Sequence, residues 1–88
     1  MSKRPKKRSL TLKGHRTSVS LEDEFWRAFL SIAKELDKPI NALAAKIDAE
    51  RELECGLASA IRLYVLAYYQ DKSDQLASAV HGLGINTQ

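Results

Sequence analysis

This chain of 88 residues has one cysteine, two prolines, one tryptophan and no long hydrophobic run. Because Cys55 stands alone, a disulfide framework is excluded, and a single thiol is typical of a reducing compartment. No stretch is apolar enough to predict a membrane span or a secretory signal. Acidic residues are also missing from the first 16 positions. These absences predict a small cytoplasmic domain without membrane attachment.

Positive charge is concentrated at the start of the chain. The first 16 residues carry seven Lys or Arg, whereas the other 72 carry seven basic and eleven acidic residues, so +7 and −4 make up the net +3. A basic arm on a mildly acidic body indicates contact with a polyanion through one end of the molecule. A solvated tail is the alternative. We expect a basic flexible arm over residues 1–14, a folded domain over 15–70 and a C-terminal tail over 71–88.

Residues 15–21, HRTSVSL, alternate with a period of two, which predicts one N-terminal β-strand. A lone strand leaves backbone donors and acceptors unpaired, so it needs a partner. One candidate is SLTL at residues 9–12, folded back across Lys13-Gly14 so that Leu12 lies beside His15. Leu10 would then lie beside Thr17. The other candidate is the same strand of a second copy, and the two do not exclude each other. The two sides of the strand are Thr17, Val19 and Leu21, and Arg16, Ser18 and Ser20.

Three helices are expected after the strand. The first begins near Glu22 and ends before Pro39, which disfavours helical backbone at the residue before it. The second runs from about Ile40 to Arg51, and a third over 57–69. One bent helix across both is the alternative to a break at 52–56, which we favour. A short helical piece is expected around 76–80.

The third helix is apolar over more of its surface than so small a monomer covers, which favours a homodimer. Arg62, on the same helix, is expected to form a structural or interface ion pair rather than to contact a polyanion. The expected dimer core comprises Thr17, Val19, Leu21, Phe25, Trp26, Phe29, Ile47, Ile61, Tyr64 and Val65.

The segments KRSLTLKGHRTSVSLEDEFW, KIDAER and LASAIRLYVL follow one another in this order. Together they resemble the ribbon-helix-helix family of DNA-binding proteins, and more narrowly a subgroup of short bacterial members with an added helix. The resemblance covers roughly residues 7–69. It implies a mainly α fold with one N-terminal strand, in the order β-α-α plus a third helix, assembled as an intertwined homodimer.

The same resemblance implies that an antiparallel ribbon from the dimer lies in the major groove of double-stranded DNA. The base-reading residues would then be Arg16, Ser18 and Ser20, with Arg16 dominant because it can donate two hydrogen bonds to guanine. The family also binds phosphate at the N-terminus of a later helix. That start is either Lys38 to Asn41, which we favour, or residues 56–59, and Asn41 is either a phosphate contact or an ordinary cap. Contacts with the DNA backbone are expected from Lys3, Arg4, Lys6, Lys7, Arg8, Lys13, His15, Lys38 and Asn41.

We therefore expect a homodimeric, sequence-preferring DNA-binding protein, a bacterial transcription regulator associated with the nucleoid. The alternative is a protein-interaction module such as an antitoxin of a toxin–antitoxin pair. The sequence has no nucleophile paired with a base, no glycine-rich phosphate loop and no metal-ligand spacing. We accordingly expect no catalytic residue, no cofactor and no metal.

Overall fold

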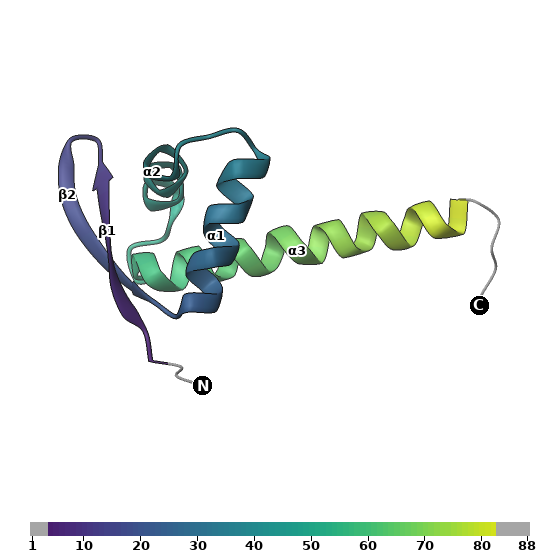
Figure 1. Cartoon of the computed structure of the whole chain (residues 1–88), viewed down its shortest axis with the longest axis horizontal. Coiled ribbons are helices and arrows are strands. Elements are labelled where there is room, and N and C mark those ends of the chain that lie inside the picture. Colours follow the sequence, from purple (N-terminus) through teal and green to yellow (C-terminus); the bar gives the residue numbers. More distant parts are fainter. Residues whose placement is uncertain (1–3, 83–88) are drawn as a thin grey trace.

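The chain folds into a β-hairpin followed by three helices, as seen in the computed structural model, which describes residues 4–82 (Figure 1). The strands pair antiparallel in a two-stranded sheet. The elements are β1 at Lys6–Leu12, β2 at His15–Leu21, α1 at Asp23–Glu35, α2 at Ile40–Glu50 and α3 at Leu57–Gly82.

The prediction of a single strand is wrong, because residues 6–12 form a strand of their own. These residues were expected within a flexible arm, since Lys6, Lys7 and Arg8 offer no apolar pattern. The hairpin alternative is confirmed in its register, with Leu12 opposite His15 and Leu10 opposite Thr17. The two-residue turn takes the positive φ angles of a type I′ hairpin, 52° at Lys13 and 84° at Gly14. Glycine makes the second of these angles accessible without steric cost.

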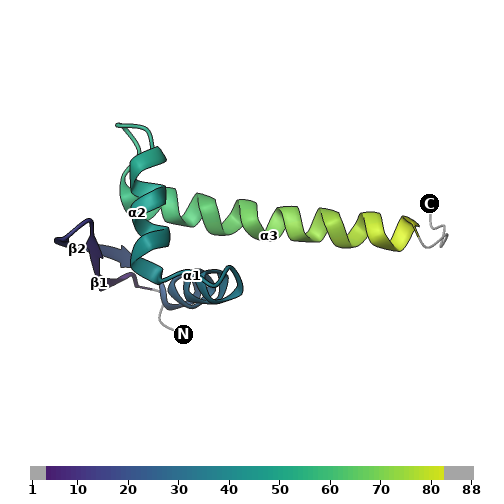
Figure 2. The same cartoon turned by 90° about the horizontal axis from the view of Figure 1, so that it is seen from above.

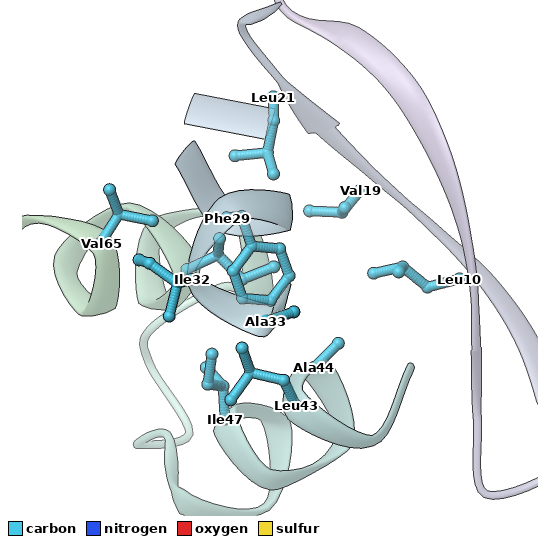
Figure 3. Packing of buried hydrophobic residues seen from close by; sticks show 11 residues of the cluster. Leu10, Val19, Leu21, Phe29, Ile32, Ala33, Leu43, Ala44, Ile47 and Val65 are labelled. Carbon is cyan, nitrogen blue, oxygen red and sulfur yellow. The ribbon is translucent and has the colours of Figure 1, made fainter. Parts of the chain in front are cut away.

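The core lies between the inner face of the hairpin and the helices (Figure 3). Leu10 of β1 and Val19 and Leu21 of β2 point toward α1, where Phe29 is fully buried. Removing these side chains from water is the main source of stability for a domain of this size. The remaining buried residues are Ile32, Ala33, Leu43, Ala44, Ile47, Ile61 and Val65.

A tight turn separates α1 from α2, as the proline predicted. Asp37 adopts a left-handed conformation with φ 58°. The Lys38 amide donates to the Ala33 carbonyl at 2.9 Å, and the Asp37 amide donates to the Lys34 carbonyl at 3.1 Å. This pattern is a Schellman motif, which satisfies carbonyls at the end of α1. The next helix starts directly after Pro39, and the predicted break between α2 and α3 is confirmed.

The third helix is longer than the sequence predicted. It continues from Leu57 through Tyr69 to Gly82, and Figure 2 shows its second half projecting away from the hairpin and the other helices. The helical piece expected at 76–80 is therefore part of α3. At 1.5 Å per residue, a helix of 26 residues is about 39 Å long.

A polar contact on both sides of the predicted boundary at Tyr69 joins α3 to the end of α1. The Tyr68 hydroxyl donates to one carboxylate oxygen of Glu35 at 2.5 Å, and the Lys72 ammonium donates to the other at 2.6 Å. The hydrogen bond from Lys72 is the main cause that lowers the pKa of Glu35. The hydrogen bond to Glu35 also raises the pKa of Tyr68 to about 12. These bonds give the start of the projecting half a fixed direction.

Most of the predicted dimer core is buried within the single chain. Phe25, Trp26 and Tyr64 pack partly buried against that core, whereas Thr17 is exposed. A second copy would therefore have to cover other apolar side chains, which α1 and α3 leave exposed. The residues of the predicted dimer core that are buried within one chain are Val19, Leu21, Phe29, Ile47, Ile61 and Val65. The exposed apolar residues on the two helices or directly after α1 are Leu30, Leu36, Leu63, Leu66, Tyr69 and Leu76.

We predict that Leu10→Ala lowers the free energy of unfolding by about 2–5 kcal/mol, because Leu10 fills the core from β1. Chemical denaturation at a fixed protein concentration measures the change. Ser9→Ala, at the exposed neighbouring position, should stay within about 0.5 kcal/mol of the wild type. Equal and small effects of both changes would mean that residues 6–12 are not part of the folded core.

Candidate nucleic-acid interface

The outer face of the hairpin is entirely polar. Paired residues of an antiparallel sheet share a face, and successive residues alternate between faces. On the face of the sheet that is turned away from the core, Lys7 pairs with Ser20, Ser9 with Ser18, and Thr11 with Arg16. All six residues are exposed. We call this set the outer polar face. It carries two cations, four hydroxyls and no acid.

All three predicted base-reading residues lie on the outer polar face. Arg16, Ser18 and Ser20 form its β2 row, and the structure places them on the side away from the buried Val19 and Leu21. Sequence reasoning missed the β1 row apart from its lysine. The only signal for Ser9 and Thr11 was the weak alternation of SLTL, whose outward residues become visible once its pairing with β2 is known.

The free edge of β2 is open over part of its length. In a two-residue type I′ hairpin the closing pair Leu12–His15 is hydrogen-bonded, so Arg16, Ser18 and Ser20 turn their backbone groups away from β1. The Ser20 carbonyl accepts a bond from Arg62 at 3.4 Å. In the described part of the chain no such contact reaches the backbone edge at Arg16 or Ser18. An open edge of this kind is a template for pairing with another strand.

The opposite edge of the hairpin is covered by α2. The amide of Thr11, on β1, donates to the Asn41 side-chain oxygen at 3.0 Å. Asn41 therefore joins the start of α2 to the hairpin and caps no helix, since the N-cap residue is Pro39 and makes no side-chain cap bond. The first amides of α2 lack partners within the helix, which makes its start attractive to anions, and Lys38 beside it is exposed.

Two arginines hold the junction between the hairpin and α1. Arg8 donates to Asp23 at 2.5 Å and to the Leu21 carbonyl at 3.1 Å, and its guanidinium lies 5.6 Å from the Trp26 ring centre. Its side chain is only 16% exposed. The structure thus gives Arg8, which the sequence assigned to the DNA backbone, a role within the chain.

The second arginine is Arg62, whose prediction as an ion pair is confirmed. It donates to Glu22 at 2.9 and 3.0 Å, and its guanidinium lies 5.8 Å from the Phe25 ring centre. Glu22 and Asp23 lie at the start of α1, where carboxylates complement the positive end of the helix dipole. They are also the acceptors that join α1 to α3 and to β1.

Other predicted backbone contacts are spread around the hairpin. Lys13 is exposed at the turn. His15 belongs to the row of residues on the inner face of the hairpin. It lines a hollow of about 390 Å³ together with Asp48 and Arg51 at the C-terminal end of α2. Lys6 is also on the inner row, 3.5 Å from Asp23. Arg4 is exposed, and the predicted contact Lys3 lies outside the described residues.

Comparison with known proteins gives one match. Residues 5–69 match the sequence profile of the ribbon-helix-helix domain. The chain belongs to this family. Ribbon-helix-helix domains are generally DNA-binding transcription regulators or antitoxins, and they typically bind DNA as dimers. No curated protein and no solved structure matches the chain.

None of the described helices of this ribbon-helix-helix chain is both long and apolar enough to cross a membrane. Within the described residues, no group of three or more His, Cys, Asp or Glu side chains is placed to hold a metal ion.

The two arginines also set the protonation of the junction. The pKa of Asp23 is lowered from its ordinary 3.8, chiefly by the hydrogen bond from Arg8. The pKa of Glu22 is lowered from 4.5, first by its own backbone amide and then by the bond from Arg62. Carboxyls with lowered pKa values stabilise the fold above their unfolded pKa values, and this contribution is lost as pH falls through the folded values.

We predict that Arg8→Met raises the pKa of Asp23 toward 3.8, because the main cause of its lowering is removed. An NMR titration of the side-chain carboxyl carbons measures this pKa. Arg16→Met removes the same charge from the outer polar face and should leave the pKa of Asp23 unchanged. An unchanged pKa in the Arg8 variant would show that the ion pair is absent in solution.

Proposed function

We propose that this chain is a transcription regulator that binds double-stranded DNA as a homodimer and reads sequence in the major groove. The observation that carries the proposal is the outer polar face, which presents Arg16, Ser18 and Ser20 beside the open edge of β2. A regulator of this kind acts at the nucleoid, where its DNA is.

The homodimer follows from the open edge. Because α2 covers the outer edge of β1 at Thr11, the edge that can accept another strand is that of β2. Two copies of β2 pairing antiparallel about a two-fold axis would satisfy the backbone groups of Arg16 and Ser18 in both chains. The resulting sheet has the order β1-β2-β2-β1, with both outer polar faces on one side.

Strand pairing alone is too small an interface for a stable dimer. Stable interfaces bury on the order of 800 Å² per partner, far more than three paired residues supply. The exposed apolar residues of α3 lie on the same side of the molecule as the open edge of β2. Arg62 contacts this edge, and Leu66 and Tyr69 come after Arg62 at helical spacing. Leu66 is 52% and Leu76 is 68% exposed. We infer that a second copy covers these exposed apolar residues of α3.

Arg16 is the residue best suited to read a base. Its guanidinium forms no hydrogen bond or ion pair with the described residues, so it can donate two hydrogen bonds to guanine O6 and N7. Ser18 and Ser20 are short and can donate or accept, so they discriminate weakly. The basic N-terminal residues then add attraction to phosphate without reading sequence.

We predict that Arg16→Ala relaxes the preferred DNA sequence at one position of each half-site, at a cost of about 1–3 kcal/mol for each bidentate contact. Selection of bound sequences from random duplexes, with wild type and variant in parallel, provides the measurement. Uniform weakening without a change of motif would assign Arg16 to the DNA backbone. Absence of binding to any duplex at low salt would reject the proposed function.

We predict that Leu66→Glu raises the dissociation constant of the dimer about tenfold or more, which corresponds to 1.4 kcal/mol. Sedimentation equilibrium over a concentration series measures it. Ala67→Glu is the matched control, since it adds the same charge at the next exposed position, about 100° around the helix. Circular dichroism checks that both variants are folded. A wild-type chain that stays monomeric at micromolar concentration would contradict the homodimer.

A protein-interaction module such as an antitoxin is the second candidate. The observation in its favour is the projecting half of α3, which continues beyond the family match at residue 69 and exposes Leu76. Stoichiometric co-purification of a small protein encoded beside this chain would favour that function. Deletion of residues 70–88 would then abolish the complex with that protein.

A further inference from the structure

In the proposed function the β1 row of the outer polar face reads no base, and of its residues only Lys7 is expected to contact the DNA backbone. Lys7, Ser9 and Thr11 are exposed on the same side as Arg16, Ser18 and Ser20, one strand further out. In the proposed dimer the two β2 strands are central and the two β1 strands lie outside them. The question is what a DNA duplex presents to the outer strands.

The width of the major groove determines whether the outer β1 strands meet bases or phosphates. Neighbouring strands lie about 4.8 Å apart, so the two β1 strands of a four-stranded sheet are separated by about 14 Å. The major groove is about 12 Å wide, which admits two strands with their side chains but not four. The central β2 strands therefore enter the groove, and the β1 strands lie over its two rims, where the phosphates are.

We propose that Lys7, Ser9 and Thr11 form a phosphate-binding rim on each side of the base-reading strands. This inference rests on the proposed function. An ammonium and two hydroxyls are groups that donate to phosphate oxygens, and such contacts fix the position of a protein on the duplex without reading its sequence. Opposite each rim residue stands a member of the β2 row, so the hairpin register aligns each phosphate contact with a base-reading position.

A contact at the outer edge of β1 agrees with this placement. The Thr11 amide is bonded to Asn41, so the start of α2 lies beside the rim rather than beside the base-reading strand. Its unpartnered first amides and the exposed Lys38 are thereby brought to the edge of the hairpin that carries the rim residues.

The rim is tested by the salt dependence of DNA binding. The apparent affinity falls with salt concentration on a logarithmic plot, with a slope of about 0.9 for each phosphate neutralised. Lys7→Ala removes one such contact from each chain, so we expect the slope of the dimer to fall by about 2, with the preferred sequence unchanged. Lys46→Ala is the matched control. It removes the same charge from an exposed residue of α2 that has no expected contact with DNA and whose ammonium lies 3.5 Å from Glu50.

A gain of function provides the second variant. Ser9→Lys adds a cation to the rim at an exposed position and should raise the slope by a similar amount. Fluorescence anisotropy with a labelled duplex from the random-pool selection gives the slopes. If the wild type binds with a preference that depends on Arg16 but Lys7→Ala behaves like Lys46→Ala, the rim is overturned and the proposed function stands. A change of preferred sequence in Lys7→Ala would also overturn it. If the wild type binds no duplex, the proposed function itself fails.

Discussion

The pairing of β1 with β2 is the constraint on which the rest of the molecule depends. Its register places Leu10 beside Thr17 and thereby sends alternate residues to opposite faces. The inner face completes a core that α1, α2 and α3 could not close by themselves, and the outer face becomes uniformly polar. A shift of one residue would expose Leu10 and bury its polar neighbours Ser9 and Thr11, so the same pairing determines both the stability of the domain and the composition of its candidate interface.

Electrostatics divides the basic residues into two groups. Arg8 and Arg62 are consumed within the chain, where each binds a carboxylate at the start of α1 and lies over an aromatic ring. Lys7 and Arg16 remain on the outer polar face. Net charge alone does not distinguish these groups, although only the second is available to a polyanion. The arginines of the first group fix the angle between hairpin and helices, and so hold the outer face in place.

Much of this arrangement could be predicted from the sequence. The strand at 15–21 and the three helices have strong local periodicity, and Pro39 marks the first turn. The first part of β1 was missed because Lys6, Lys7 and Arg8 carry no apolar signal, whereas its second part, residues 9–12, was one of the two candidate partners of the strand at 15–21. The partners of Arg8 and Arg62 lie 15 and 40 residues away, beyond the reach of local pattern. The length of α3 was underestimated because its second half is mostly polar and is tied down by Glu35 and Lys72.

The central claim is that DNA meets the outer polar face of the hairpin. NMR chemical-shift mapping of the isotope-labelled protein with a short duplex tests this claim directly. The account predicts that the largest changes fall on Arg16, Ser18 and Ser20, with smaller changes at Lys7 and Ser9 and none along the projecting half of α3. Changes confined to α3, with the hairpin resonances unmoved, would contradict it.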